Sequence, residues 1–187
     1  AGAWDEMKLG EYQELYYTKK VDFGIYLSER PGGDERVLLP VRQVPPSACA
    51  GEKIRVFLYK DSKDRLIATT NEPKLTLGHF ATLTVKEVGK IGAFLDWGLE
   101  KDLFLPYKEM TRQVRTGDEV LVTLYIDKSE RLCASMKGLY DLLEKESPYQ
   151  KGDTVEGRVY EFSNNFGTFV AVDDRYSARI AKPEDNS

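Results

Sequence analysis

Apolar and polar residues alternate along much of this chain, and such alternation is typical of half-buried β-strands. It is clearest in KIRVFLY, residues 53–59, and in EVLVTLYI, residues 119–126, where apolar residues recur at every second position. Short turn-forming stretches separate such runs, at residues 31–33, 61–64, 117–118 and 127–130. The pattern predicts a chain of many short strands joined by tight turns.

One sequence phrase occurs three times along the chain. LGEYQELYYTKKVDFGIYL, residues 9–27, matches LGHFATLTVKEVGKIGAFL, residues 77–95, and more weakly KGDTVEGRVYEFSNNFGTFV, residues 151–170. Further on, GEKIRVFLYKDSKDRLIAT, residues 51–69, aligns without a gap with GDEVLVTLYIDKSERLCAS, residues 117–135. The chain is therefore a tandem repeat of one small unit.

Each complete repeat predicts five short strands. They are a long strand, a strand that contains the glycine, a short strand ending at Pro40 or Pro106, and a final hairpin. Five strands suit a small closed barrel better than a sandwich, which needs about seven. We therefore predict an all-β fold of tandem five-stranded OB-fold barrels.

A short helix is expected between the second and third units. Leu139, Leu142 and Leu143 have helical spacing, and Pro148 ends the pattern. The third unit stops before its last two strands, which would leave sheet edges uncovered. Either the chain is cut there or the unit has a different role, and we favour truncation. The predicted domains are a first barrel at 7–74, a second barrel at 75–137, a helical linker at 138–149 and an incomplete third barrel at 150–187.

Composition narrows the function classes. The chain has 187 residues, 41% of them hydrophobic, and a net charge of -4. This acidic balance argues against a nucleic-acid binder that relies on charge alone, but it leaves binding by base stacking open. There is no apolar run of about 18 residues, and Cys49 and Cys133 stand too far apart to suggest a disulfide framework. We expect a cytoplasmic protein with no membrane partner.

A glycine recurs in the repeated phrase with large apolar residues one position before it and two after it. Residues three apart share a strand face only where a bulge changes the alternation, and glycine tolerates the backbone angles of a bulge. We therefore predict bulges at Gly24, Gly92 and Gly167. The side chains they would bring together are Phe23 with Tyr26, Ile91 with Phe94, and Phe166 with Phe169. Exposed rings of this kind can stack on unpaired bases, whereas ordinary core packing is the alternative for any single ring.

The phrases VGKIGAFLDWGLEKDLFLP, residues 88–106, and GDEVLVTLYIDKSERLCASMK, residues 117–137, resemble the S1-type RNA-binding domain. Residues 8–182 as a whole resemble the N-terminal part of the conserved virulence factor B family. Members of that family carry tandem S1 domains followed by a winged-helix domain. The resemblance implies OB-fold barrels, binding of single-stranded RNA and a role as a bacterial post-transcriptional or gene-expression regulator.

The resemblance also implies particular RNA-binding positions. S1 domains use an aromatic residue on each side of the glycine, a histidine on the third strand, and an Asp and an Arg that flank the last hairpin. The matching residues are Phe23, Tyr26, Asp61 and Arg65 in the first unit, Phe94, Asp127 and Arg131 in the second, and Phe166 and Phe169 in the third. Ile91 replaces the first aromatic of the second unit. The histidine position falls on Pro40, Pro106 and about Ala181, so no unit keeps the histidine.

Several other side chains are candidates for RNA contact. Basic residues near the glycine strands could meet phosphates, with an ordinary solvated charge as the alternative for each. They are Lys19, Lys20, Lys86, Lys90 and Arg158. Trp97 either stacks on a base or packs against a neighbouring domain. His79 is expected at the surface.

The chain shows none of the common catalytic or metal-binding motifs, so we expect no enzyme, metal or cofactor. Two functions remain. The first is a protein that binds single-stranded RNA by stacking, with a ribosome or an RNA-processing protein as a candidate further partner. The second is a protein-interaction scaffold of OB barrels that has lost most RNA contacts, which the pI of about 5.3, the lost histidine and Ile91 favour. Burial of Phe23 and Tyr26 would favour the scaffold.

Overall fold

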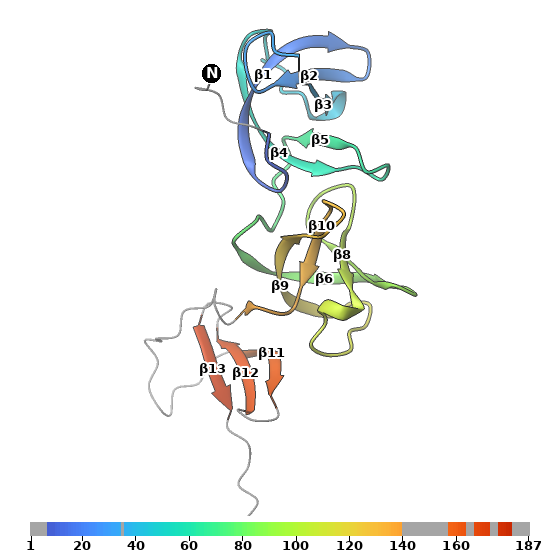
Figure 1. Ribbon diagram of the computed structural model, residues 1–187, viewed down its shortest axis with the longest axis vertical. Helices are drawn as coiled ribbons and strands as arrows, with labels where there is room; N and C mark the ends of the chain where they lie inside the picture. Colours follow the sequence, from blue (N-terminus) through green and yellow to red (C-terminus); the bar gives the residue numbers. More distant parts are fainter. Residues whose placement is uncertain (1–6, 35, 140–156, 164–166, 173–175, 181–187) are drawn as a thin grey trace, which may run out of the picture. The chain divides into compact units, whose positions relative to one another are not determined.

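The computed structural model describes residues 7–34, 36–139, 157–163, 167–172 and 176–180 (Figure 1). The chain forms two compact units. Its described strands make two closed five-stranded barrels and one three-stranded sheet. The prediction of an all-β fold with tandem five-stranded barrels is therefore confirmed.

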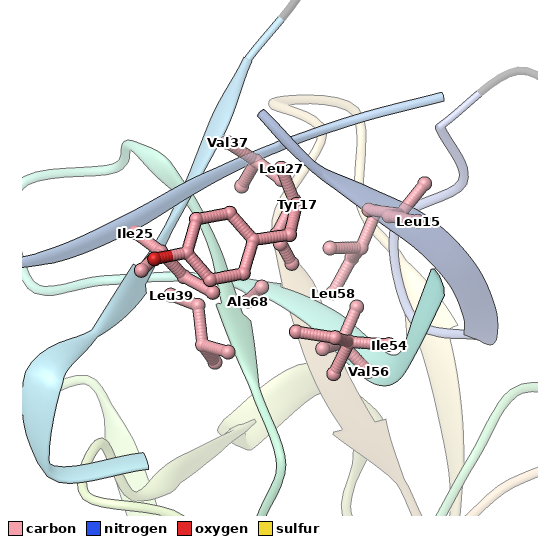
Figure 2. Close-up of a cluster of buried hydrophobic side chains, with 10 residues drawn as sticks. All are labelled: Leu15, Tyr17, Ile25, Leu27, Val37, Leu39, Ile54, Val56, Leu58 and Ala68. Atoms are coloured by element: carbon pink, nitrogen blue, oxygen red, sulfur yellow. The ribbon is translucent and has the colours of Figure 1, made fainter. Parts of the chain in front are cut away.

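The first barrel has the strand order β1-β2-β3-β5-β4, in which β3 and β5 run parallel and the other neighbours pair antiparallel. Its strands are β1 (Tyr12–Val21), β2 (Gly24–Ser28), β3 (Val37–Pro40), β4 (Lys53–Lys60) and β5 (Leu66–Thr69), and the 3₁₀ turn η1 (Val41–Gln43) follows β3. Alternate residues point inward, as the sequence pattern requires. Leu15, Leu27, Leu39 and Leu58 lie among the side chains that fill the barrel (Figure 2).

The second barrel repeats this strand order. Its strands are β6 (Phe80–Val88), β7 (Gly92–Asp96), β8 (Leu103–Pro106), β9 (Glu119–Ile126) and β10 (Leu132–Ser135), and η2 (Tyr107–Glu109) follows β8. Here β8 and β10 form the parallel pair. The hydrophobic side chains buried on its strands include Leu83, Leu95, Leu105 and Val122.

The third repeat contributes β11 (Gly157–Ser163), β12 (Gly167–Val172) and β13 (Tyr176–Ile180), paired antiparallel in that order. That the third repeat is an incomplete barrel stays a prediction. Of the expected helical linker, Leu139 is buried and packs with Leu121. Residues 140–149 lie outside the described residues.

The predicted bulges at Gly24, Gly92 and Gly167 were wrong. Gly24 pairs in regular register with Val21 on one side and Pro40 on the other. The register shifts occur on the preceding strands, at Thr18 in β1, Lys86 in β6 and Tyr160 in β11. The extra residue thus belongs to the long first strand of each repeat, where a bulge adds the bend that this strand makes around the barrel.

The recurring glycine meets a different requirement, the close approach of the neighbouring strand. A Cβ atom at Gly24, where φ is 154°, would run into the carbonyl oxygen of Leu39. A Cβ atom at Gly92, where φ is 157°, would run into that of Leu105. Glycine is therefore needed at both positions because the backbone of the neighbouring strand occupies the space, and at Gly92 the Phe104 ring also lies 2.8 Å from the Cβ position.

Candidate nucleic-acid interface

Phe23 and Tyr26 form an exposed ring pair on the first barrel. Asp22 and Phe23 make the turn between β1 and β2, and Phe23 is 56% exposed, whereas Tyr26 is half-buried on β2. Their ring centroids are 6.3 Å apart with the planes at 88°, an edge-to-face arrangement. The structure brings the predicted pair together through the turn rather than through a bulge. The burial of Phe23 that would favour the scaffold alternative is not observed.

A row of half-buried apolar side chains continues from this pair across the barrel. Tyr26 lies opposite Leu38 on β3, and Leu38 lies beside Ile67 on β5. On the other side, Tyr26 pairs with Lys19, whose side chain is exposed. The first barrel therefore presents an apolar strip with an ammonium group at its edge.

A cavity of about 580 Å³ opens beside the turn. Both neighbours of Phe23 in the chain, Asp22 and Gly24, contribute to its lining, together with Lys20 and Val41. The cavity thus lies beside the turn, and Phe23 itself is not among its lining residues.

The predicted acidic residues hold the final hairpins in shape. Oδ1 of Asp61 accepts hydrogen bonds from the backbone amides of Lys63 (2.9 Å) and Arg65 (3.0 Å), and the Nε of Arg65 donates to Oδ2 at 3.0 Å. In the second barrel, Oδ1 of Asp127 accepts the amide of Arg131 at 2.9 Å. These contacts are typical of an Asx turn and agree with the turns expected at residues 61–64 and 127–130. The contact of both aspartates with RNA stays a prediction.

The turn also sets the charge state of Asp61. Partial burial raises the pKa of this carboxyl, but the backbone amides of Arg65 and Lys63 and the Arg65 guanidinium lower it by more, so the net pKa lies below its ordinary value. The hairpin stands at the opposite end of the apolar row from Phe23, because β5 starts at the hairpin and runs parallel to β3. The four predicted residues of the first barrel therefore mark the two ends of one face.

The second barrel arranges its side chains differently. Ile91 in the turn is 66% exposed and Lys90 beside it is also exposed. Phe94 is half-buried on β7 and packs against Phe104 of β8, with ring centroids 5.3 Å apart and planes at 37°. Phe94 pairs with Glu87 on β6, where the first barrel has a lysine.

Two aromatic residues of the second barrel were missed by the sequence analysis, Phe104 and Tyr107. Phe104 was recoverable, because Leu103 and Leu105 point inward and a residue between them must point out. Tyr107 begins η2 and is 48% exposed, and its hydroxyl donates a hydrogen bond to the carbonyl of Gly89. It follows the proline that ends the strand, so strand periodicity gave no signal for it.

The remaining candidate residues for RNA contact differ in exposure and in ion pairing. Lys20 is exposed, whereas Lys86 forms an ion pair with Asp102 at 3.1 Å. Trp97 is buried, which excludes stacking and agrees with a packing role. His79 is exposed, as predicted. In the third repeat, Phe166 lies outside the described residues, and Phe169 and Arg158 are placed only by backbone register.

Metal sites and membrane-spanning helices were also sought among the described residues. Among them, no three His, Cys, Asp or Glu side chains gather where they could hold a metal ion. Within the same part of the chain, no helix is long and apolar enough to cross a membrane.

Comparison with known proteins decides the family. Residues 9–71 and residues 77–137, which span the two closed barrels, each match the family model for the S1 domain. The chain belongs to the S1 domain family. Its first and second barrels are two S1 domains in tandem.

Two longer proteins are similar to most of this chain. The chain is 30% identical over 169 residues to Conserved virulence factor B of Staphylococcus haemolyticus, covering 85% of this chain and 56% of that protein. It is 26% identical over 180 residues to YitL of Bacillus subtilis, an uncharacterized protein, covering 91% and 58%. These similarities confirm the resemblance noted in the sequence. This chain spans less than two thirds of either relative.

A solved structure shares the fold. It is a multidomain protein with nucleic acid binding domains from Streptococcus pneumoniae, 22% identical to this chain. The TM-score is 0.66, and the match covers 89% of this chain and 60% of that one. The fold is therefore shared at low sequence identity.

Proposed function

We propose that the two S1 domains bind single-stranded RNA by stacking unpaired bases on the aromatic faces of their barrels. The observation that carries this proposal is the Phe23–Tyr26 pair, a ring 56% exposed beside a half-buried ring with Lys19 at its edge. Stacking on an aromatic side chain contributes about 1–3 kcal/mol per base and tolerates any sequence, because every base has a π-face.

The charge of the chain supports stacking over phosphate binding as the main source of affinity. The net charge is -4, and Lys86 already has a carboxylate partner. Each phosphate neutralised on a single strand changes the logarithmic salt dependence of the association constant by about 0.7. A binder with few phosphate contacts should therefore lose little affinity when the salt concentration is raised.

The cellular role in this proposal is a cytoplasmic post-transcriptional or gene-expression regulator, acting alone or with a ribosome or an RNA-processing protein. The similarity to Conserved virulence factor B supports it. So does the fold shared with a protein described as having nucleic acid binding domains. Asp61, Arg65, Lys90, Asp127 and Arg131 are further proposed RNA contacts at the edges of the two faces.

The test is fluorescence anisotropy with a labelled single-stranded RNA of mixed sequence, at two salt concentrations and with duplex DNA as competitor. The double change Phe23→Ala, Tyr26→Ala should weaken RNA binding tenfold or more, because it removes the stacking surface of the first barrel. Wild-type binding should fall only modestly between the two salt concentrations.

The matched control is Tyr12→Ala. Tyr12 lies at the other end of β1, and the Arg55 guanidinium already covers its ring at 4.3 Å from the centroid. Its removal should change RNA affinity by less than about twofold. An absence of RNA binding, or equal losses for the control and the double change, would contradict the proposal and support the scaffold alternative.

A further inference from the structure

Each S1 domain carries two exposed side chains where the turn before its second strand meets the end of its third strand. In the first domain these are Phe23 and Val41, and the amide of Val41 donates to the carbonyl of Phe23 at 3.0 Å. In the second domain they are Ile91 and Tyr107, joined by the same backbone hydrogen bond at 3.5 Å. The two positions are therefore equivalent in both domains.

The domains place their ring at opposite members of this pair. The first domain has the ring in the turn, at Phe23, and an aliphatic side chain, Val41, 58% exposed, after the strand. The second domain has the aliphatic Ile91 in the turn and the ring of Tyr107 after the strand. All four side chains are large, apolar and open to solvent. The aromatic missing from the turn of the second domain is thus matched by an aromatic at the adjoining position.

Tyr107 is anchored to the turn at two points. Its backbone amide donates to Ile91, and its side-chain hydroxyl donates to the carbonyl of Gly89. The side chain nevertheless remains 48% exposed. A ring that is already held in place loses less conformational entropy when a base stacks on it, which favours binding.

A second ring surface lies on β8, the strand that precedes Tyr107. Phe104 packs against Phe94 and is half-buried. It precedes Pro106 by two residues, so it lies about 7 Å along β8 from the strand end where Tyr107 follows. The second domain therefore offers ring surfaces both on β8 and directly after it.

We propose that Tyr107 is the principal base-stacking residue of the second S1 domain and forms, with Phe94 and Phe104, a site for unpaired nucleobases of single-stranded RNA. This inference rests on the proposed function and extends it to residues outside the family pattern. Ile91 then holds the turn position that Phe23 holds in the first domain.

The competing explanation is that Tyr107 only clamps the turn through its hydroxyl. Tyr107→Phe separates the two, because it keeps the ring and removes the hydrogen bond to Gly89. Val41→Ala is the matched control, since it truncates the equivalent position of the first domain without removing a ring.

The experiment measures affinity for the same labelled RNA, in wild type and in the Phe23→Ala, Tyr26→Ala background, where avidity from the first domain no longer hides the second. Tyr107→Ala should weaken binding fivefold or more in that background, whereas Tyr107→Phe and Val41→Ala should change it by less than about twofold. The double exchange Ile91→Phe, Tyr107→Val copies the arrangement of the first domain. It should bind within about threefold of its parent.

Contrary results can be told apart. If the Phe23→Ala, Tyr26→Ala change weakens binding but Tyr107→Ala does not, the inference is overturned and the proposed function stands. If Tyr107→Phe loses as much affinity and as much thermal stability as Tyr107→Ala, Tyr107 is a clamp and the inference is overturned. If the wild-type chain binds no RNA, both proposals fall together.

Discussion

The two barrels differ in where the exposed ring stands: Phe23 lies in the turn before β2, whereas Tyr107 follows β8. They also differ in the charge beside the ring on the second strand. Lys19 pairs with Tyr26 in the first barrel, and Glu87 pairs with Phe94 in the second. The backbone frame that carries these side chains is the same in both barrels. Each barrel has a register shift on its first strand, a glycine packed closely against the third strand, and an aspartate turn in the last hairpin.

This contrast separates two kinds of constraint. The shared features fix the path of the backbone: a bulge, a close approach of two strands and a hairpin turn. The differing features lie at outward-facing positions. There the exposed ring is Phe23 in the first barrel and Tyr107, at the position equivalent to Val41, in the second. A search for nucleic-acid contacts in such repeats should therefore compare exposed residues that are equivalent in space, rather than residues that are aligned in sequence.

The largest effect is expected from the shared frame. Gly24→Ala and Gly92→Ala should each lower the free energy of unfolding by about 3 kcal/mol, because the new Cβ meets a backbone carbonyl that cannot move aside. Gly51→Ala and Gly117→Ala are the controls. They occupy equivalent turns with φ near 90° and open space around them, so each should cost only about 1 kcal/mol.

Chemical denaturation of the four variants provides the measurement. Equal costs at all four glycines would contradict the close-approach explanation. Unequal costs at Gly24 and Gly92 would show that the two barrels do not share one frame.

A charge exchange tests the difference at the flanking position. Lys19→Glu should weaken RNA binding about tenfold, because a hydrogen bond to a charged group contributes about 1.5 kcal/mol. Glu87→Lys should strengthen binding and steepen its salt dependence by about 0.7 per phosphate gained. Glu14→Lys, on the β4-paired half of β1, controls for net charge. If Glu14→Lys strengthens binding as much as Glu87→Lys, the flanking position has no special role.

The smallest effect concerns the hairpin. Asp61→Asn should destabilise the first barrel by about 1 kcal/mol near neutral pH, because the ionised carboxylate accepts the stronger hydrogen bonds. The pKa of Asp61 is lowered in the folded chain, so its contribution is complete above the unfolded value near 4 and is lost as the pH falls through the lower folded value. Thermal unfolding between pH 2 and pH 7 checks this. Parallel curves for wild type and variant would contradict it.

Much of the fold was predictable from the sequence because its signals are local. Alternation in β4 and β9 and the repeated aspartate turns specify strands and hairpins directly. The register shift was misplaced because its extra residue lies among polar residues, Thr18 to Lys20, where alternation carries no signal.

The candidate site was predictable only in part. Phe23 and Tyr26 follow the family pattern and were brought together as expected. The place of Tyr107 depends on a hydrogen bond to Gly89, eighteen residues earlier in the chain, and such tertiary contacts leave no periodic pattern in the sequence. Asp61 was expected both in a turn and at an RNA contact, and its hydrogen bonds in the structure are those of the turn.

The most direct test of the central claim is an NMR titration of the aromatic side chains with an unstructured single-stranded RNA. We predict upfield shifts for the ring protons of Phe23, Tyr26 and Tyr107 as bases stack on them, while Phe57, which is fully buried, stays unchanged. RNA binding that leaves these three rings unperturbed would contradict recognition by stacking on the two barrel faces.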